Sequence, residues 1–333
     1  MRTKSYEVTR YRIGGRFWQV DFEHASDAAL PRCDSLLATL TEAPKCAEAL
    51  LRVSRAPVEA NLAWPLPLRH DEEVVCTSGP EPRVYLVDGL LYFGARDGVA
   101  EVCIGDPPGN MFKGVVGAGV LYRLAQSGVL SLHASAVVGE SGAILVLGGS
   151  GLGKSTLSAA WMHLGQVVSD DHVLVCLGVT EEPAAWVEPF RADLYLGYDD
   201  IRLIPDAARA KVEDGGAKAC LLRAEAREYF CECAPIVALM RLEPGGRGAS
   251  SVVQPLSQAE MLLAIVSANT YLSAGPRLAP PTLWTAACKL ASGLPAFRLT
   301  VGSDLLKHPE SAAHSLRNLI GDNLRPIQSS RNH

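Results

Sequence analysis

The sequence predicts an α/β fold, α+β over the whole chain, with a β-rich N-terminal domain at residues 1–108 and a second domain at residues 111–325. Three observations predict it. In residues 84–102 short apolar runs alternate with Asp-Gly turns, which is typical of an antiparallel meander. Residues 143–156 pass from an apolar strand through a glycine-rich loop into a helix. Residues 105–110 contain two prolines and two glycines, so they continue neither regular structure and mark the domain boundary.

The N-terminal domain begins with two expected strands, residues 6–13 and 17–22, joined by the turn Gly14-Gly15. Residues 36–51 are expected to be helical. Residues 65–82 are rich in proline and are expected to be irregular. With the meander that follows, strands dominate this domain.

The second domain alternates strands and helices. Ser257 and Glu260 form a capping box at the start of one helix, and Gly293 suits a left-handed cap at the end of another. Pro281 stands near the start of that second helix, and residues 139–142 form a turn between two strands. Strands are expected at residues 129–138, 143–147 and 236–242, and helices at residues 111–126, from 155 onward, 257–268 and 281–293.

Composition excludes several classes of partner. The 31 lysines and arginines are outnumbered by 36 acidic residues, so the net charge of −5 provides no field for a nucleic-acid backbone. The N-terminus lacks the apolar core of a secretory signal, and no apolar stretch is long enough to span a bilayer, so no membrane partner is expected. The nine cysteines include no paired C-x-x-C clusters, which favours buried thiols in a reducing cytoplasm over disulfides or a zinc knuckle.

The glycine-rich loop matches the phosphate-binding pattern G-x-x-x-x-G-K-[ST] without a mismatch. Its glycines can reach positive φ and let backbone N–H groups surround phosphate oxygens, and the following helix points its N-terminus at the same anion. An ordinary glycine-rich turn is the alternative, which the Lys-Ser pair and the preceding strand disfavour. The candidate nucleotide-binding residues are Gly148, Gly149, Ser150, Gly151, Leu152, Gly153, Lys154 and Ser155.

Three further side chains are candidates for chemistry. Asp170 and Asp171 follow a short apolar strand fifteen residues after the loop, and such a pair can supply both a magnesium ligand and a general base. An Asp-rich turn between two strands is the alternative. His133 lies on an expected strand, on one face with Ser131 and Ser135, where it lines a site or serves as a satisfied structural histidine.

A family resemblance depends on these residues. His133-Ala134-Ser135-Ala136-Val137, the loop at residues 148–156, and Ser169-Asp170-Asp171 together resemble the catalytic core of the HPr kinase/phosphorylase superfamily. In particular they resemble HPr-kinase-related proteins encoded beside peptide-modifying enzymes. The resemblance covers residues 112–325 and is specific at their start. It implies a compact P-loop kinase fold, related to phosphoenolpyruvate carboxykinase, that transfers the γ-phosphoryl group of ATP to a serine hydroxyl.

The resemblance implies a role for each matching residue. Asp170 matches the base that deprotonates the acceptor serine and Asp171 the metal-associated carboxylate, with the order of the two left open. His133 matches the histidine beside the transferred phosphate. Lys154 would contact the phosphates and Ser155 the Mg²⁺ ion. The residues that match the nucleotide-binding loop are Gly151, Gly153, Lys154, Ser155 and Thr156.

The chain also departs from the family. Thr156 stands where bifunctional HPr kinases usually carry glutamate, and residues 188–194 keep Arg191 without the family's Arg-Gly signature. These departures leave open both the phosphorylase reaction and the recognition of HPr itself. Arg191 and Lys218 are candidate phosphate or substrate contacts. The alternative, that each is an ordinary surface cation, has at least equal weight.

The predicted function is an ATP- and Mg²⁺-dependent serine kinase acting on a protein or ribosomal peptide. A small-molecule kinase, acting on free serine or a similar alcohol, stays open. So does a nucleotide-sensing or delivery protein, although the complete set of loop and acidic residues disfavours it. The β-rich domain suits recognition of the acceptor and could equally be a scaffold. Because the resembling family commonly forms hexamers, the resemblance also implies that a homo-oligomer can form.

Overall fold

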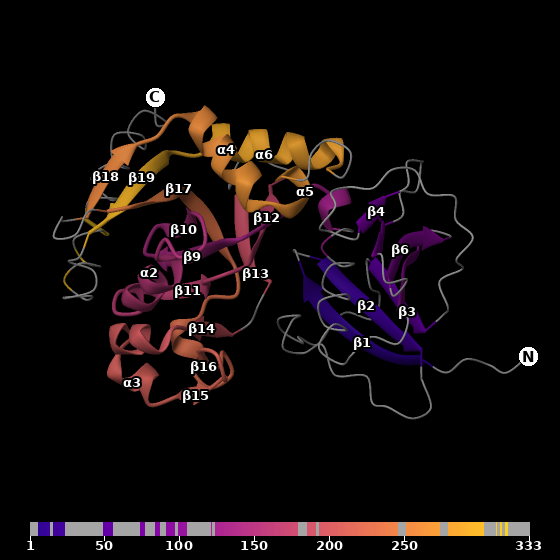
Figure 1. The fold of residues 1–333 in the computed structure, drawn as a ribbon, viewed down its shortest axis with the longest axis horizontal. Helices are drawn as coiled ribbons and strands as arrows, with labels where there is room; N and C mark the ends of the chain where they lie inside the picture. Colours follow the sequence, from indigo (N-terminus) through magenta and orange to yellow (C-terminus); the bar gives the residue numbers. More distant parts are fainter. Residues whose placement is uncertain are drawn as a thin grey trace, which may run out of the picture. The chain divides into compact units, whose positions relative to one another are not determined.

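The computed structural model describes residues 124–178, 185–190, 193–245, 251–273 and 279–302, residues 121, 311, 314, 317 and 318, and seven backbone strands between residues 6 and 104. The chain divides into two compact units, Met1–Leu124 and Ala125–His333 (Figure 1). The expected boundary at residues 105–110 lies outside the described residues and stays a prediction. So does most of the expected helix 111–126, whose described residues are helical.

The described part of the first unit is one seven-stranded sheet in the order β1-β2-β3-β7-β6-β5-β4. The first two strands form the expected antiparallel hairpin, and the fifth to seventh form the expected antiparallel meander. The third strand is parallel to both of its neighbours. The strands are β1 (Tyr6–Ile13), β2 (Arg16–Glu23), β3 (Ala49–Arg55), β4 (Val74–Cys76), β5 (Val84–Leu86), β6 (Leu91–Arg96) and β7 (Val99–Ile104).

Two expectations for this unit are corrected. Residues 49–51, expected at the end of a helix, belong to β3, because pairing with strands on both sides holds the chain extended whatever its local preference. Residues 74–76, expected to be irregular, form β4. The remaining residues of those two segments lie outside the described part of the chain.

The second unit is built on a nine-stranded mixed sheet in the order β11-β9-β10-β17-β13-β12-β8, with β19 paired to β17 and β18 paired to β19. The pairs β10–β17 and β17–β19 are parallel, and the others are antiparallel. The prediction of a mixed α/β fold is confirmed. The strands are β8 (Leu130–Leu132), β9 (Ala134–Gly139), β10 (Gly142–Leu147), β11 (Gln166–Ser169), β12 (Val173–Leu177), β13 (Ala185–Pro189), β17 (Ala234–Pro244), β18 (Val252–Pro255) and β19 (Ala296–Val301).

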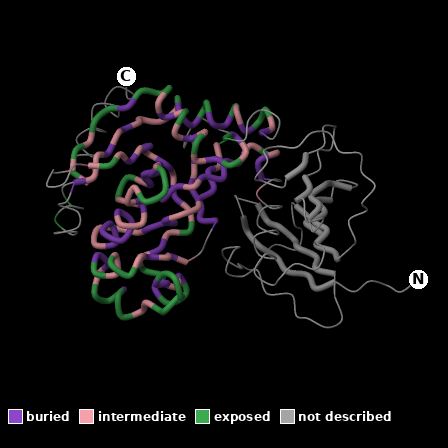
Figure 2. Tube along the Cα trace, in the orientation of Figure 1, coloured by how far each residue is buried: buried purple, intermediate pink, exposed green. Residues whose placement is uncertain are grey.

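Helices cover both faces of this sheet (Figure 1). Alternate residues of β10 belong to two hydrophobic clusters: Leu145 packs with α4 and α6, whereas Val146 packs with α2. Figure 2 shows the buried stretches concentrated in the central strands. The helices are α2 (Lys154–Trp161), α3 (Asp206–Arg209), α4 (Gln258–Ala268), α5 (Thr270–Ser273) and α6 (Pro281–Gly293), with 3-10 turns η2 (Tyr198–Leu203) and η3 (Arg227–Tyr229), and a small sheet of β14 (Leu194–Leu196), β16 (Ala219–Leu221) and β15 (Val212–Asp214).

The caps of two helices test the expectations made from local sequence. The capping box before α4 is confirmed, since Ser257 and Glu260 exchange side-chain and backbone hydrogen bonds. The left-handed cap at Gly293 is wrong. Gly293 is the last residue of α6 and is not among the glycines with positive φ, and Leu294 after it is extended at φ −129°. The chain continues in extended conformation from Leu294 into β19, so it does not pass through the left-handed region after the helix.

Two observations concern the expected compartment and partners. Within the described ranges, no helix is both long and apolar enough to cross a membrane. None of the five cysteines whose side chains are described forms a disulfide, and among these five Cys220 alone is buried.

Candidate phosphate-binding and acid–base site

The glycine loop joins the end of β10 to the start of α2. Leu147 is the last residue of the strand and Lys154 the first of the helix. Gly151 and Gly153 adopt positive φ, at 76° and 96°, so the loop turns twice through the left-handed region that favours glycine. Gly153 is the N-cap of α2, which directs the positive end of the helix dipole at the loop. The local geometry is that of an anion cradle.

We expect Gly153→Ala to weaken nucleotide binding through backbone strain alone. A methyl group at Gly153 would meet nothing within 4 Å, so its cost is the left-handed φ of 96°, about 1–2 kcal/mol. Calorimetric titration with Mg·ATP should show binding weakened by about tenfold or more. The control is Gly293→Ala, which also meets nothing within 4 Å but lies at an ordinary φ. Equal affinities of the Gly153→Ala and wild-type proteins would contradict this account of the loop.

The expected strand 129–138 is broken at His133, and the break creates the second half of the site. β8 before His133 pairs with β12, while β9 after it pairs with β10 and β11. The partner strands β11 and β12 are also separated opposite His133, because residues 170–172 lie between them. Each pair of strands therefore parts where these residues stand. We call His133 and residues 170–172 the fork. None of these four residues belongs to a strand.

The fork and the loop meet through a chain of contacts. Lys154 Nζ lies 3.1 Å from His133 Nε2, and His133 Nδ1 lies 3.0 Å from Asp171 Oδ1. Both contacts are satisfied when His133 carries its proton on Nδ1 and donates it to Asp171, while Nε2 accepts from the ammonium group. Lys154 also donates to the carbonyl oxygens of Gly148 and Gly149, at 2.8 and 3.1 Å. Burial lowers the pKa of Lys154, and the charges of Asp171 and Asp170 oppose that shift.

Asp170 differs from its neighbour in burial. It is 3% exposed, whereas the side chains of Asp171 and His133 are 33% and 45% exposed. Burial raises the pKa of Asp170 to about 6, while a hydrogen bond from Ser155 and the charge of Lys218 pull it down. A carboxylate with such a pKa is ionised at neutral pH and is a stronger proton acceptor than an exposed one.

The remaining predicted residues lie outside this chain of contacts. Ser150 and Gly151 lie exposed at the tip of the loop. Thr156 turns away from the loop and donates to Asp200 Oδ1 at 3.1 Å, which ties α2 to η2. Lys218 is exposed, with its charge acting on Asp170. Arg191 lies outside the described residues.

The site suits a magnesium ion that is held jointly with a nucleotide. Among the described residues no group of three or more His, Cys, Asp or Glu side chains gathers into a metal cage. The Ser155 hydroxyl and the carboxylates of Asp170 and Asp171 do offer oxygen ligands beside the loop. Mg²⁺ is commonly bound by one or two such groups together with phosphate oxygens and water. The residues present therefore fit a magnesium–nucleotide complex.

No protein-family model and no curated protein matches the sequence. Among solved structures, the chain is similar to the HPr(Ser) kinase/phosphatase from Coxiella burnetii. The match covers 60% of this chain and 98% of that chain, with 11% sequence identity and a TM-score of 0.31. The relation is distant. What the site can do chemically follows from its own residues.

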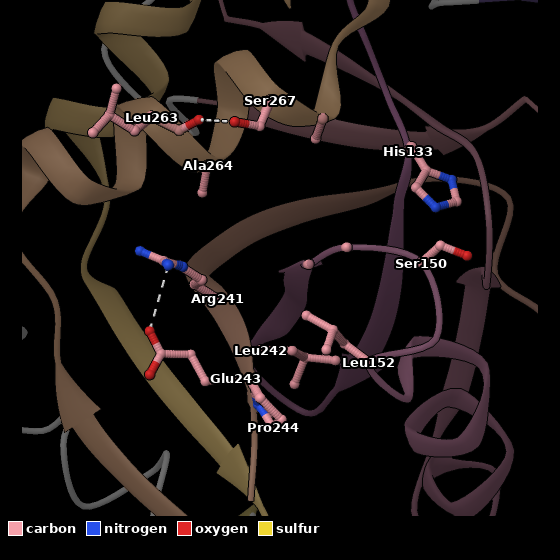
Figure 3. A pocket seen from close by; sticks show the side chains of 13 residues that line it. His133, Ser150, Leu152, Arg241, Leu242, Glu243, Pro244, Leu263, Ala264 and Ser267 are labelled. Carbon is pink, nitrogen blue, oxygen red and sulfur yellow. Dashed lines mark hydrogen bonds and ion pairs between the residues drawn. The ribbon is translucent and has the colours of Figure 1, made fainter.

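The loop also borders a pocket of about 610 Å³ that the sequence did not predict (Figure 3). Leu152 and Leu242 line one side of it, and Leu263 of α4 lines the other. A signal was present in the sequence, since residues 261–266 are six consecutive apolar residues. A helix that covers a sheet with one face needs a narrower apolar stripe. The run therefore indicated a second contact for α4.

Proposed function

We propose that the chain is an ATP- and Mg²⁺-dependent kinase that transfers the γ-phosphoryl group to a serine hydroxyl of a protein or ribosomal peptide. The observation that supports it most is the meeting of two halves of a phosphoryl-transfer site. Lys154 and Ser155 of the loop each contact the fork, the first through His133 and the second through Asp170. A cradle, a cation, oxygen ligands for magnesium and a buried carboxylate are the groups that phosphoryl transfer requires.

Each residue has a proposed part in the reaction. Lys154 leaves the loop carbonyls and contacts the β- and γ-phosphates, and Ser155 and Asp171 hold the magnesium ion. Magnesium, when bound, neutralises charge on the phosphates. Asp170 accepts the proton of the attacking serine, whose oxygen forms a bond to the γ-phosphorus as the bond to the β-phosphate oxygen breaks. His133 orients Asp171 on one side and Lys154 on the other, so that it holds the magnesium ligand and the cation in fixed positions relative to each other.

The serine acceptor rests on the sequence resemblance rather than on a contact within the described residues. Free serine as acceptor uses the same base and the same cradle. A protein that only binds a nucleotide would need neither a carboxylate with a raised pKa, such as Asp170, nor a second carboxylate that contacts His133, such as Asp171. The presence of both supports transfer over binding alone.

The deciding experiment supplies Mg·ATP labelled at the γ-phosphate to the full chain with three acceptors: serine-containing ribosomal peptides, free serine and HPr. We expect a phosphate mass shift on peptide serine. In Lys154→Ala the shift should be absent, with Lys211→Ala, a half-buried lysine that pairs with Glu228 outside the site, as the matched control. Tight binding of Mg·ATP with no transfer to any acceptor would contradict the kinase proposal. Transfer to free serine but not to peptides would contradict the proposed acceptor class.

A further inference from the structure

The pocket beside the loop has one end at the glycine loop and an opposite end (Figure 3). His133 and Ser150 line the first, while Arg241 and Glu243 line the second, where β17 ends. Between them the walls are apolar. Its volume of about 610 Å³ lies within the range of pockets that bind small organic ligands, roughly 300–1,000 Å³. The pocket is thus large enough for more than phosphates.

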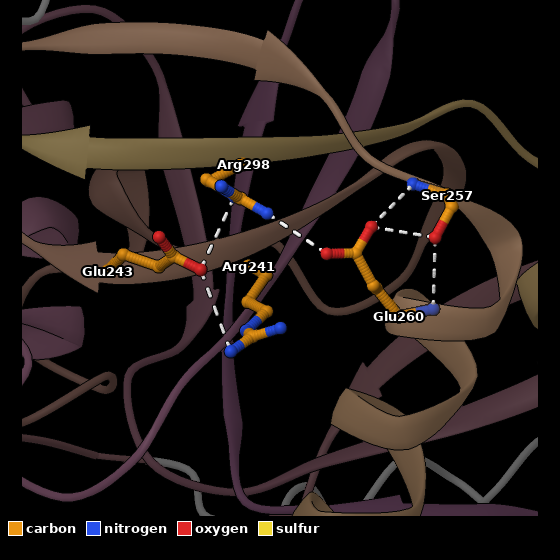
Figure 4. A network of polar contacts seen from close by, with 5 residues as sticks. All are labelled: Arg241, Glu243, Ser257, Glu260 and Arg298. Carbon is orange, nitrogen blue, oxygen red and sulfur yellow. Dashed lines mark hydrogen bonds and ion pairs between the residues drawn. The ribbon is translucent and has the colours of Figure 1, made fainter.

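The opposite end of the pocket is held by a network of ion pairs (Figure 4). Glu243 Oε1 lies 3.5 Å from Arg241 Nη2 and 3.3 Å from Arg298 Nε. Arg298 Nη2 lies 3.0 Å from Glu260 Oε1, and Glu260 also closes the capping box of α4. The network links β17, β19 and α4, so it fixes the distance between the two walls. It also orients the planar guanidinium of Arg241, which borders the pocket.

The order of the strands determines which way a bound nucleotide runs. Asp170 and Asp171 follow β11, which lies on one side of the loop strand β10, whereas β17 lies on its other side. If the γ-phosphate is beside the two aspartates, the opposite end of the triphosphate leaves the loop on the β17 side. The pocket lies there, outside the carboxyl ends of the parallel strands β10 and β17, where open α/β sheets bind ligands.

We propose that this pocket binds the nucleoside of the nucleoside triphosphate. The base lies between Leu242 and Leu152 on the loop side and Leu263 on α4. The ribose and base edge receive hydrogen bonds from Arg241, and the Ser267 hydroxyl, which donates to the Leu263 carbonyl oxygen, accepts one from the nucleoside. Leu263 is 66% exposed, a large apolar surface that a bound base would cover. This assignment rests on the proposed function only for the position of the γ-phosphate.

The test compares two ligands that share the triphosphate and differ in the nucleoside. Binding of Mg·ATP and of Mg·tripolyphosphate to the full chain is measured by calorimetry. We expect ATP to bind the wild-type chain at least about tenfold more tightly. Arg241→Lys keeps the charge that attracts phosphate but loses the planar fork, and Leu263→Ser loses the apolar wall. Each should weaken ATP binding about five- to tenfold and leave tripolyphosphate binding unchanged.

Matched controls lie outside the pocket: Arg202→Lys in η2, an exposed arginine, and Val252→Ser in β18, whose valine is 46% exposed. Neither should change the affinity for either ligand. Equal affinities of the wild-type chain for ATP and tripolyphosphate would overturn the proposal, as would pocket variants that leave ATP binding intact or weaken both ligands alike. Nucleoside-dependent binding without phosphoryl transfer would uphold the pocket and overturn the kinase. A wild-type chain that binds neither ligand would overturn both.

Discussion

Replacing Asp170 by asparagine is expected to lower kcat for phosphoryl transfer by about 10²–10⁴-fold, the range for loss of a general base. Asparagine keeps the shape of the side chain and can still accept the hydrogen bond from Ser155, but it cannot take up a proton. The affinity for Mg·ATP should change by no more than about threefold, because the loop and Lys154 are intact. Single-turnover transfer and calorimetric binding measure the two quantities separately.

Asp171→Asn is the matched variant, because it removes the adjacent carboxylate. Asp171 contacts His133 and is the proposed magnesium ligand, so its loss should raise the Mg²⁺ concentration needed for half-maximal activity. If instead Asp170→Asn raises the magnesium requirement and Asp171→Asn lowers kcat at saturating magnesium, the two roles are exchanged. A parental transfer rate in Asp170→Asn would remove Asp170 from the reaction altogether.

The second large effect concerns stability without nucleotide or metal. Because the pKa of Asp170 rises from 3.8 in the unfolded chain to about 6 in the folded one, the folded state binds the proton more tightly. The contribution of Asp170 to stability is therefore fully present below about pH 4 and is lost as the pH rises through about 6. Asp170→Asn escapes this loss. We expect its free energy of unfolding to exceed the wild-type value by on the order of 3 kcal/mol at pH 8 and by little at pH 4.

Urea unfolding in the presence of a chelator at the two pH values measures this difference. Asp214→Asn is the control of opposite sign. The Tyr198 hydroxyl and the Gly216 N–H hold the pKa of Asp214 below its usual value, so this carboxylate stabilises the folded state at high pH. Its replacement should destabilise the chain at pH 8 and have less effect as the pH falls. Identical pH profiles for the wild-type and Asp170→Asn chains would contradict a buried carboxylate of raised pKa. An Asp170→Asn chain that is more stable but inactive would show that the buried carboxylate needed for activity lowers the stability of the folded state.

The features that were predictable from the sequence are those set by neighbours along the chain. β10, the glycine loop and α2 follow from residues 143–156, because strand, turn and helix are each signalled locally. The capping box at Ser257 and Glu260 is equally local, and the structure contains it. The resemblance named His133, Asp170 and Asp171 together. Their contacts with the loop are findings of the structure.

The features that were missed depend on pairing between distant segments. Residues 129–138 are mostly apolar and give no signal of a break, yet His133 interrupts them because β8 and β9 find different partners. The network of Arg241, Glu243 and Arg298 joins residues up to 57 positions apart, which no local pattern reveals. Gly293 failed as a cap for the same reason, since the position of β19 decides how α6 ends.

The fork at His133 also limits how the chain can vary. Both strands that part there are paired on either side of it, with Leu132 opposite Val173 and Ala136 opposite Ser169. A slip of one residue in the register of either pairing would turn every side chain of that strand to the other face of the sheet. The register of the strands on either side of the fork is therefore fixed by the core, not only by chemistry. The chain can change in length more freely in segments that no strand pairing constrains.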